Sequence, residues 1–344
     1  MKAQPVPKPE VKVTAAFGLR ECPKVVELLQ HEDLPVRQQA LLVLHELFRL
    51  PEKVAMALRA GVVGELLRLS CDDDDDTTRK RATFGLAALA NDANGKQALL
   101  ESEACAVCVS RLQDPNAEVR INAYEALLRL SRSLQGVDVV CACEGSVELF
   151  VSRASEEVDA VRPMTLKLLY QVLDHRSGRA MQDAHKSGAV DVCTRLLGSD
   201  VPEVREGSAS ALSKLAINEA GKQFAIKSGS VEVLCELLAD SFPRVRQHAA
   251  AALMTIAIDD EGKEATLKAG GVERLIKLIR DRQRLVKLSA LKAIATVSAH
   301  PEARRRFVSS SLCVESLNAL VAEADDTVLQ RTARIAKEVV EWTP

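Results

Sequence analysis

The chain has 344 residues, of which 47% are hydrophobic and 3% aromatic, and its formal net charge is −2. This balance gives no general attraction to nucleic acid or to an anionic membrane. The sequence has no run of 18 apolar residues and no charged-then-apolar leader, so we expect a chain that neither spans a membrane nor is secreted. Nine scattered cysteines favour a reducing compartment over a disulfide framework.

The first segment, residues 1–20, is predicted to be an extended, proline-rich arm without a core of its own. Pro5, Pro7 and Pro9 alternate with other residues and remove backbone donors, which favours extended backbone. A flexible terminus is the favoured interpretation, and ordering of the arm against a partner is the alternative.

Residues 21–344 are predicted to form an array of repeats. The stretch 203–216 (EVREGSASALSKLA) has apolar or small residues on one face of a helix, and relatives of it recur along the chain. The residue after the first apolar position marks each copy, and successive markers are 41 to 43 residues apart: Arg37, Arg79, Arg120, Arg162, Arg205, Arg246, Lys287 and Leu329. Each unit is predicted to contain a medium helix, a turn with Asp or Pro, a long helix and a short helix, with eight long helices in all.

Three further columns support this unit. Four residues after the Val position the side chain is always small (Ala40, Ala82, Ala123, Thr165, Ser208, Ala249, Ala290 and Thr332), as close helix packing requires. Glycines are predicted to precede the short helices (Gly95, Gly136, Gly178, Gly221 and Gly262) and to cap their ends in the left-handed conformation (Gly61, Gly145, Gly188, Gly229 and Gly270).

Candidate sites for chemistry are weak. The six histidines lie in different units, and Asn94-Gly95-Lys96 lacks the first glycine and the Ser or Thr of a phosphate loop. Cys105, Cys108, Cys141 and Cys143 could be imagined as zinc ligands, but the first two stand in columns of core aliphatic residues. The acidic run 72–76 lacks the alternating ligands of a calcium loop and is interpreted as a solvated turn. We therefore predict no catalytic residue, cofactor, metal or small-molecule substrate, and no enzyme activity.

Charge is distributed unevenly along the array. Twelve Lys or Arg face four acids between Lys263 and Arg306, a local excess of +8, whereas residues 138–159 have the opposite bias. Solvated helix faces explain either region alone, but their separation suggests different partner surfaces at two places.

The three-helix unit of about 42 residues resembles the armadillo repeat, with the two-helix HEAT repeat as second choice. The resemblance implies an all-α, right-handed superhelical solenoid. Armadillo receptors for nuclear-import peptides carry ladders of Asn and Trp on their long helices. The corresponding columns here hold Glu46, Ala88, Arg129, Gln171, Lys214, Thr255, Thr296 and Glu338, and Leu42, Phe84, Glu125, Lys167, Ser210, Ala251, Lys292 and Arg334, so such a receptor is not expected.

A narrower resemblance rests on the two ends of the array. Cys22-Pro23-Lys24 with Glu32-Asp33-Leu34, and the terminal Val339-Val340-Glu341-Trp342, are similar to the radial spoke protein 14 family of ciliary and flagellar axonemes. The resemblance implies a non-enzymatic scaffold subunit of the radial spoke in the axoneme, bound to other spoke proteins. A soluble cytoplasmic armadillo adaptor that binds peptide segments reversibly is the alternative.

A partner surface is predicted on the later long helices. If these helices line a concave groove, its charge changes from Glu46 and Glu125 early to basic residues later. We expect an acidic, extended or helical segment of a neighbouring protein to lie along the later half. The predicted contact residues are Lys167, Lys214, Lys292 and Arg334, and reversing Lys214 and Lys292 together is expected to weaken assembly.

Overall fold

A computed structural model describes residues 18–174, 178–322 and 326–343, and within these ranges every regular element is a helix. The chain divides into two compact units, residues 1–146 and 147–344, which are considered separately. The predicted all-α class is confirmed. The predicted arm falls largely outside the described residues; Gly18–Arg20 form one 3₁₀ turn, and the first α-helix begins at Glu21.

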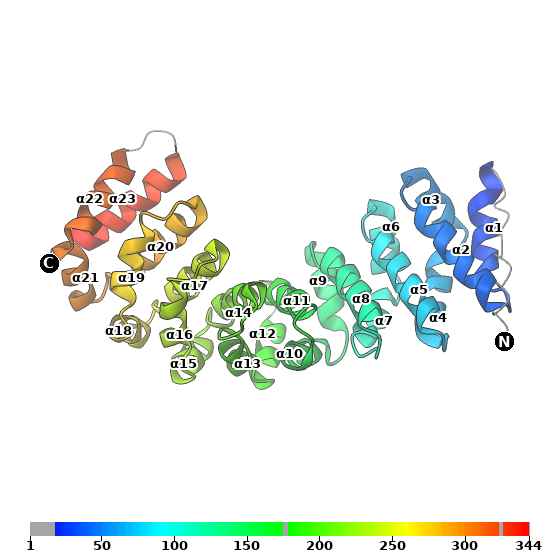
Figure 1. Cartoon of the computed structure of the whole chain (residues 1–344), viewed down its shortest axis with the longest axis horizontal. Helices are drawn as coiled ribbons and strands as arrows, with labels where there is room; N and C mark the ends of the chain where they lie inside the picture. The colour runs from blue at the N-terminus through cyan, green and yellow to red at the C-terminus, as the bar shows by residue number, and fades with distance from the viewer. Residues whose placement is uncertain (1–17, 175–177, 323–325, 344) are drawn as a thin grey trace, which may run out of the picture. The chain divides into compact units, whose positions relative to one another are not determined.

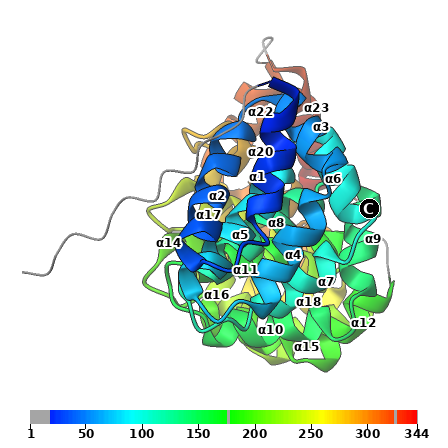
Figure 2. The ribbon, with the colours of Figure 1, turned by 90° about the vertical axis from the view of Figure 1, so that its right-hand side faces the viewer.

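The first unit repeats the order medium, long, short three times (Figure 1). Its helices are α1 (Glu21–Leu28), α2 (Leu34–Leu47), α3 (Pro51–Arg59), α4 (Val62–Asp72), α5 (Asp76–Leu89), α6 (Ala93–Leu100), α7 (Ala104–Arg111), α8 (Ala117–Leu130) and α9 (Leu134–Ala142). The long helices α2, α5 and α8 pack side by side, and α1 packs on α2 and α3, which Figure 2 shows in the foreground. This stacking makes one long-helix face in the unit.

The second unit continues the same order. Its helices are α10 (Ser146–Glu156), which begins at the boundary, α11 (Arg162–Asp174), α12 (Gly178–Lys186), α13 (Ala189–Leu196), α14 (Pro202–Leu215), α15 (Glu219–Lys227), α16 (Ser230–Leu237), α17 (Pro243–Ile256), α18 (Asp260–Lys268), α19 (Gly271–Leu278), α20 (Arg284–Val297), α21 (Pro301–Ser309), α22 (Ser311–Ala322) and α23 (Thr327–Glu341). The long helices α11, α14, α17, α20 and α23 pack in that order. Together with α2, α5 and α8 they are the eight predicted long helices.

The core is aliphatic, and the predicted column of small residues lies inside it. Ala249 of α17 and Ala290 of α20 are fully buried at the interface between these two helices. The predicted register of the last copy is wrong by one residue: Leu329 is buried three residues after the cap Asp326, so Ala333 and not the half-buried Thr332 takes the small position. A small side chain at this position lets neighbouring long helices approach closely.

The loops between medium and long helices explain the regular spacing of the marker residues. Arg205 donates from Nη1 to the carbonyl of Ser199 in its own loop, at 2.8 Å, and from Nε to Asp240 in the next repeat, also at 2.8 Å. Arg79 with Asp114 and Arg246 with Asp281 repeat this arrangement. In these three copies the marker therefore ties its loop to the following repeat.

The two glycine columns have different outcomes. The left-handed caps are confirmed, since Gly61, Gly145, Gly188, Gly229 and Gly270 all have positive φ. The other column was placed wrongly, because its glycines lie inside the short helices. Asn218 caps α15 by accepting a hydrogen bond from the Gly221 amide at 2.8 Å, so the helix begins before the glycine. A Cβ on Gly221 would stand 1.7 Å from the carbonyl oxygen of Leu215, so this close approach is what requires glycine.

Candidate functional site

Two of the four cysteines considered as zinc ligands belong to the core, and Cys141 and Cys143 are half-buried. Cys105 and Cys108 are buried, and burial raises the pKa of both thiols, that of Cys105 to about 12. Within the described ranges no cluster of three or more His, Cys, Asp or Glu is arranged to hold a metal ion. Thiols that remain protonated at neutral pH are poor zinc ligands, which favours the interpretation as core residues.

The acidic run before α5 is part of the repeat architecture. Asp73 forms an ion pair with Arg37 at 3.0 Å, and Asp75 caps α5 by accepting a hydrogen bond from the Thr78 amide at 2.7 Å. Asp75 also accepts a hydrogen bond from Gln38 at 2.7 Å. These contacts lower the pKa of Asp75 despite the opposing effect of its burial. The described carboxylates of this run therefore serve the local fold.

The four residues predicted to bind a partner differ in availability. Lys167 on α11, Lys292 on α20 and Arg334 on α23 are exposed, and none of them forms an ion pair with another described residue. Lys214 on α14 is half-buried, pairs with Asp174 and lies 5.1 Å from the centre of the Tyr170 ring. Burial opposes its charge, but the hydrogen bond that Lys214 donates to Asp174 and the contact with Tyr170 raise the pKa of Lys214. We call these four residues the basic face; three of them are free for a ligand.

The basic stretch 263–306 is partly neutralised within the fold. Arg306 pairs with Glu302 at 2.9 Å and with Glu273 at 3.5 Å. Arg284 pairs with Asp326, and this hydrogen bond together with the Leu329 amide lowers the pKa of Asp326 to about 2. The exposed charge is therefore smaller than the sequence count of +8 suggests.

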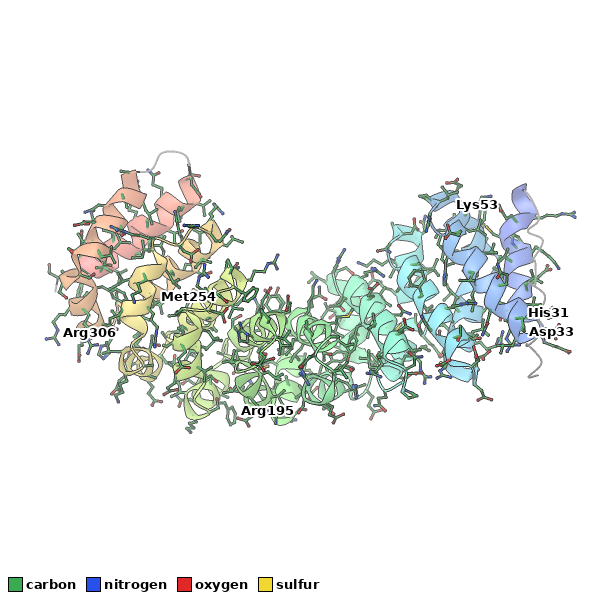
Figure 3. All side chains as sticks on the ribbon, in the orientation of Figure 1. His31, Asp33, Lys53, Arg195, Met254 and Arg306 are labelled. Atoms are coloured by element: carbon green, nitrogen blue, oxygen red, sulfur yellow. The ribbon has the colours of Figure 1, made fainter. Side chains whose placement is uncertain are left out.

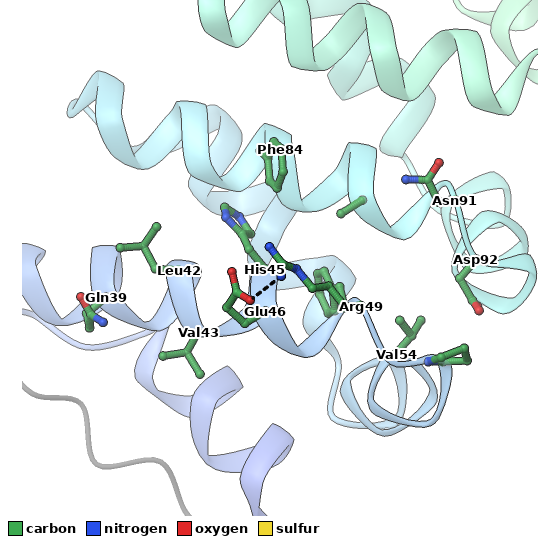
Figure 4. Close-up of a pocket in the computed structure, with 13 residues that line it drawn as sticks. Gln39, Leu42, Val43, His45, Glu46, Arg49, Val54, Phe84, Asn91 and Asp92 are labelled. Carbon is green, nitrogen blue, oxygen red and sulfur yellow. Dashed lines mark ion pairs between the residues drawn. The ribbon is translucent and has the colours of Figure 1, made fainter.

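A hollow on the long-helix face of the first unit was not predicted. It has a volume of about 790 Å³, and its walls include Leu42, His45 and Phe84 (Figure 4). The Nε2 atom of His45 lies 2.8 Å from the Arg81 carbonyl, and its ring is 4.5 Å from that of Phe84. Burial lowers the pKa of His45, so the ring is neutral at physiological pH. Leu42 and Phe84 are 39% and 44% exposed, so part of the wall of this hollow is apolar and open to solvent.

The sequence contained a signal for this hollow. Leu42 and Phe84 occupy the column that carries Trp in peptide-binding armadillo proteins, and both are large and apolar. The absence of Trp from this column argues against an import receptor. It does not show that Leu42 and Phe84 lie on two helices that pack together, α2 and α5.

None of the helices in the described part of the chain combines the length and hydropathy that a membrane crossing requires.

Comparison with known proteins supports the predicted relationship. No protein-family model matches the chain. Radial spoke protein 14 of Chlamydomonas reinhardtii is 30% identical over 236 residues, which are 65% of this chain and 61% of that protein. The match thus spans less than two thirds of the relative's length.

Solved structures show the same architecture. The crystal structure of an engineered protein superposes with a TM-score of 0.84 at 27% identity, over 94% of this chain and 79% of the other. A computationally designed armadillo-repeat protein for modular peptide recognition superposes with a TM-score of 0.60 at 22% identity, over 68% of this chain and 99% of the other. The armadillo repeat is therefore confirmed over the HEAT repeat. The chain has the armadillo-repeat fold, and its sequence is similar to that of radial spoke protein 14.

Proposed function

We propose that the chain is a non-enzymatic scaffold subunit of the axonemal radial spoke in cilia or flagella, where it binds neighbouring spoke proteins. The observation that carries this proposal is the relationship to radial spoke protein 14. The fold supports it, since stacked repeats offer a long surface for protein contacts.

Extraction of axonemes tests the assignment. The tagged chain is expressed in a ciliated cell, the membrane is removed with detergent, and the axoneme is washed with increasing salt. A spoke subunit is expected to stay with the axoneme at about 0.15 M salt and to resist higher salt, because buried contacts are screened far less than surface charges. A chain that leaves completely in the first detergent wash contradicts the assignment.

Within this function, the basic face is proposed to contact an acidic segment of a neighbour. Lys292 and Arg334 lie on the adjacent packed helices α20 and α23, and both are exposed without an ion pair among the described residues. Because Lys214 is held by Asp174, it contributes only if that pair opens. Charge complementarity on an open face affects association and salt dependence more than the fold.

The matched experiment compares two charge reversals. Lys292→Glu with Arg334→Glu is expected to reduce incorporation into axonemes, more strongly at higher salt. Lys186→Glu with Lys227→Glu changes charge equally at exposed positions on short helices and is expected to incorporate normally. Equal incorporation of both variants would show that the basic face is not the contact.

A reversible peptide adaptor is the second candidate, and the hollow around Phe84 favours it, because its exposed apolar wall suits an exchanging ligand. An adaptor would leave the axoneme in the first wash, and Phe84→Ala would abolish its partner binding. A spoke subunit with that substitution would still be retained.

A further inference from the structure

One side of α21 lines a second hollow, in the second unit, which we call the α21 pocket. Its volume is about 570 Å³, and the α21 residues in its wall include Pro301, Arg304, Arg305 and Val308. Their spacing places them on one face of the helix. The opposite wall contains Trp342, which follows α23.

The repeat register identifies what covers the equivalent surface elsewhere. Lys222 of α15 and Arg304 of α21 occupy the same position in successive copies of the short helix. Lys222 pairs with Asp259, the residue that precedes α18, and α15 packs against α18. Val245 and Leu329 are both buried, three residues after the caps Phe242 and Asp326 of their long helices. Ile258 stands thirteen residues after Val245, and Trp342 stands thirteen after Leu329. Trp342 therefore holds the position immediately before the residue that precedes the next short helix.

Burial shows the consequence for α21. Lys222 and Lys263, at the position of Arg304, are only 7% and 8% exposed. Leu267 of α18, at the position of Val308, is 6% exposed, whereas Val308 is 45% exposed. The α21 pocket is thus the surface that a following short helix would cover, and no described helix covers it.

The rim of this pocket is cationic. Arg305 is exposed and has no ion pair among the described residues, and the guanidinium of Arg304 lies 4.6 Å from the centre of the Trp342 ring. Glu341, the carboxylate in the lining, pairs with Lys337 at 3.8 Å. Arg306, labelled in Figure 3, is already paired with Glu302 and Glu273. Two guanidinium groups therefore remain without a carboxylate partner at the rim.

We propose that the α21 pocket binds one short amphipathic helix of a partner protein, in the position of a further short helix of the array. Its first turn carries acidic residues that meet Arg304 and Arg305, as Asp259 meets Lys222. Acidic residues there also complement the dipole of the bound helix. One apolar side chain of the ligand packs between Val308 and Trp342. This site is separate from the basic face and does not depend on the spoke assignment.

The single tryptophan of the chain reports on this site directly. Trp342 is 55% exposed, so a ligand that covers it is expected to shift its fluorescence emission to shorter wavelength. The probe is a synthetic peptide of residues 258–270 of this chain, the segment that lies against α15. After Ile258 it carries three acids, Asp259, Asp260 and Glu261. An i,i+4 hydrocarbon link on its exposed side keeps it helical, because isolated helices this short are marginal.

The full 344-residue chain is titrated with this peptide, and a saturable emission shift is expected. Arg305→Glu and Val308→Glu are each expected to weaken binding about tenfold, as loss of a central contact does. Arg282→Glu, an exposed reversal in the same basic stretch, should leave binding within about twofold. A peptide with its three leading acids replaced by Lys should not bind.

Circular dichroism establishes that each variant keeps its fold. Absence of any emission shift with the parent chain would overturn the proposal, as would equal binding by the parent, Arg305→Glu and Val308→Glu. Neither result bears on retention in the axoneme, so this proposal and the spoke assignment can fail separately.

Discussion

Arg205 and Asp240, thirty-five residues apart and in consecutive repeats, form an ion pair of 2.8 Å between Nε and Oδ2. Asp240 also accepts a hydrogen bond from the Phe242 amide at 2.8 Å, which fixes the turn before α17. Both side chains are largely buried, with exposed fractions of 14% and 7%. One carboxylate thus shapes its own loop and holds the preceding repeat.

Asp240→Ala is expected to lower the free energy of unfolding by about 2–4 kcal/mol, because it leaves a largely buried guanidinium and a loop amide without their acceptor. Urea denaturation measures the change. The control is Arg244→Ala, which removes a more exposed pair with Glu206 and should cost about 0.5 kcal/mol or less. Equal losses in the two variants would show that the pair contributes no more than a surface contact.

Gly221→Ala is expected to cost at least about 3 kcal/mol, since its Cβ would overlap the Leu215 carbonyl oxygen. That oxygen also lies 3.0 Å from Nε2 of His185, which restricts its movement. Gly178→Ala is the matched control, because a Cβ there meets nothing within 4 Å. It should change stability by less than about 1 kcal/mol in either direction. Similar thermal midpoints for the two variants would contradict the close approach.

The sequence predicted the repeat and its register because both depend on local periodicity. The marker Arg205 was recognised by its spacing, but its partner Asp240 was not, since the pair exists only once two loops are brought together. Gly221 is predicted to precede its helix because the sequence pattern alone does not show that Asn218, three residues earlier, caps α15. The periodicity of the sequence predicts where helices lie, whereas helix caps and ion pairs depend on the geometry of side chains in the folded chain.

The candidate sites were predicted less well for the same reason. Lys167, Lys292 and Arg334 are exposed as expected, but the pairing of Lys214 with Asp174 joins two helices and has no sequence signature. The sequence pattern gives Trp342 no role beyond the resemblance of the chain ends. Its place opposite α21 depends on the packing of the folded chain.

Ala249→Leu is expected to destabilise the second unit by about 1–3 kcal/mol, because the added carbons have no space between α17 and its neighbours. Ala251→Leu, two residues further on and half-buried, places the same group toward the open side and should cost less than about 0.5 kcal/mol. Chemical denaturation of the two variants compares them. A larger loss for Ala251→Leu would contradict the assignment of the packed face.

Buried thiols should make stability fall at alkaline pH. Burial raises the pKa of Cys193 and Cys235 to about 12, whereas an unfolded thiol ionises near pH ~8.5. The stability that the protonated thiols contribute is complete below the pKa of the unfolded thiol. It is lost as the pH rises toward the pKa of the folded thiol. At pH 10 each thiol therefore favours unfolding by about 2 kcal/mol.

The test compares the parent chain with the double variant Cys193→Ala and Cys235→Ala between pH 8 and pH 10. The variant is expected to start from a lower stability, because truncation leaves small cavities, but to lose about 4 kcal/mol less over this interval. Parallel curves would show that these thiols ionise equally in the folded and unfolded chain.

Binding of an acidic ligand to the basic face should depend on the pair between Lys214 and Asp174. Asp174→Asn removes the carboxylate that pairs with Lys214, and the charge of the lysine is then no longer compensated by that residue. The affinity for a fluorescein-labelled oligoglutamate peptide is therefore expected to rise about two- to fivefold, the effect of one partly exposed charge. Fluorescence anisotropy at about 0.15 M salt measures the affinity. The gain should shrink at about 1 M salt, where the Debye length is only about 3 Å.

The controls are charge reversals. Lys292→Glu and Arg334→Glu should weaken binding, and Lys186→Glu and Lys227→Glu should not. If Asp174→Asn binds the peptide like the parent, Lys214 takes no part in the basic face, and only its three exposed members remain as contacts.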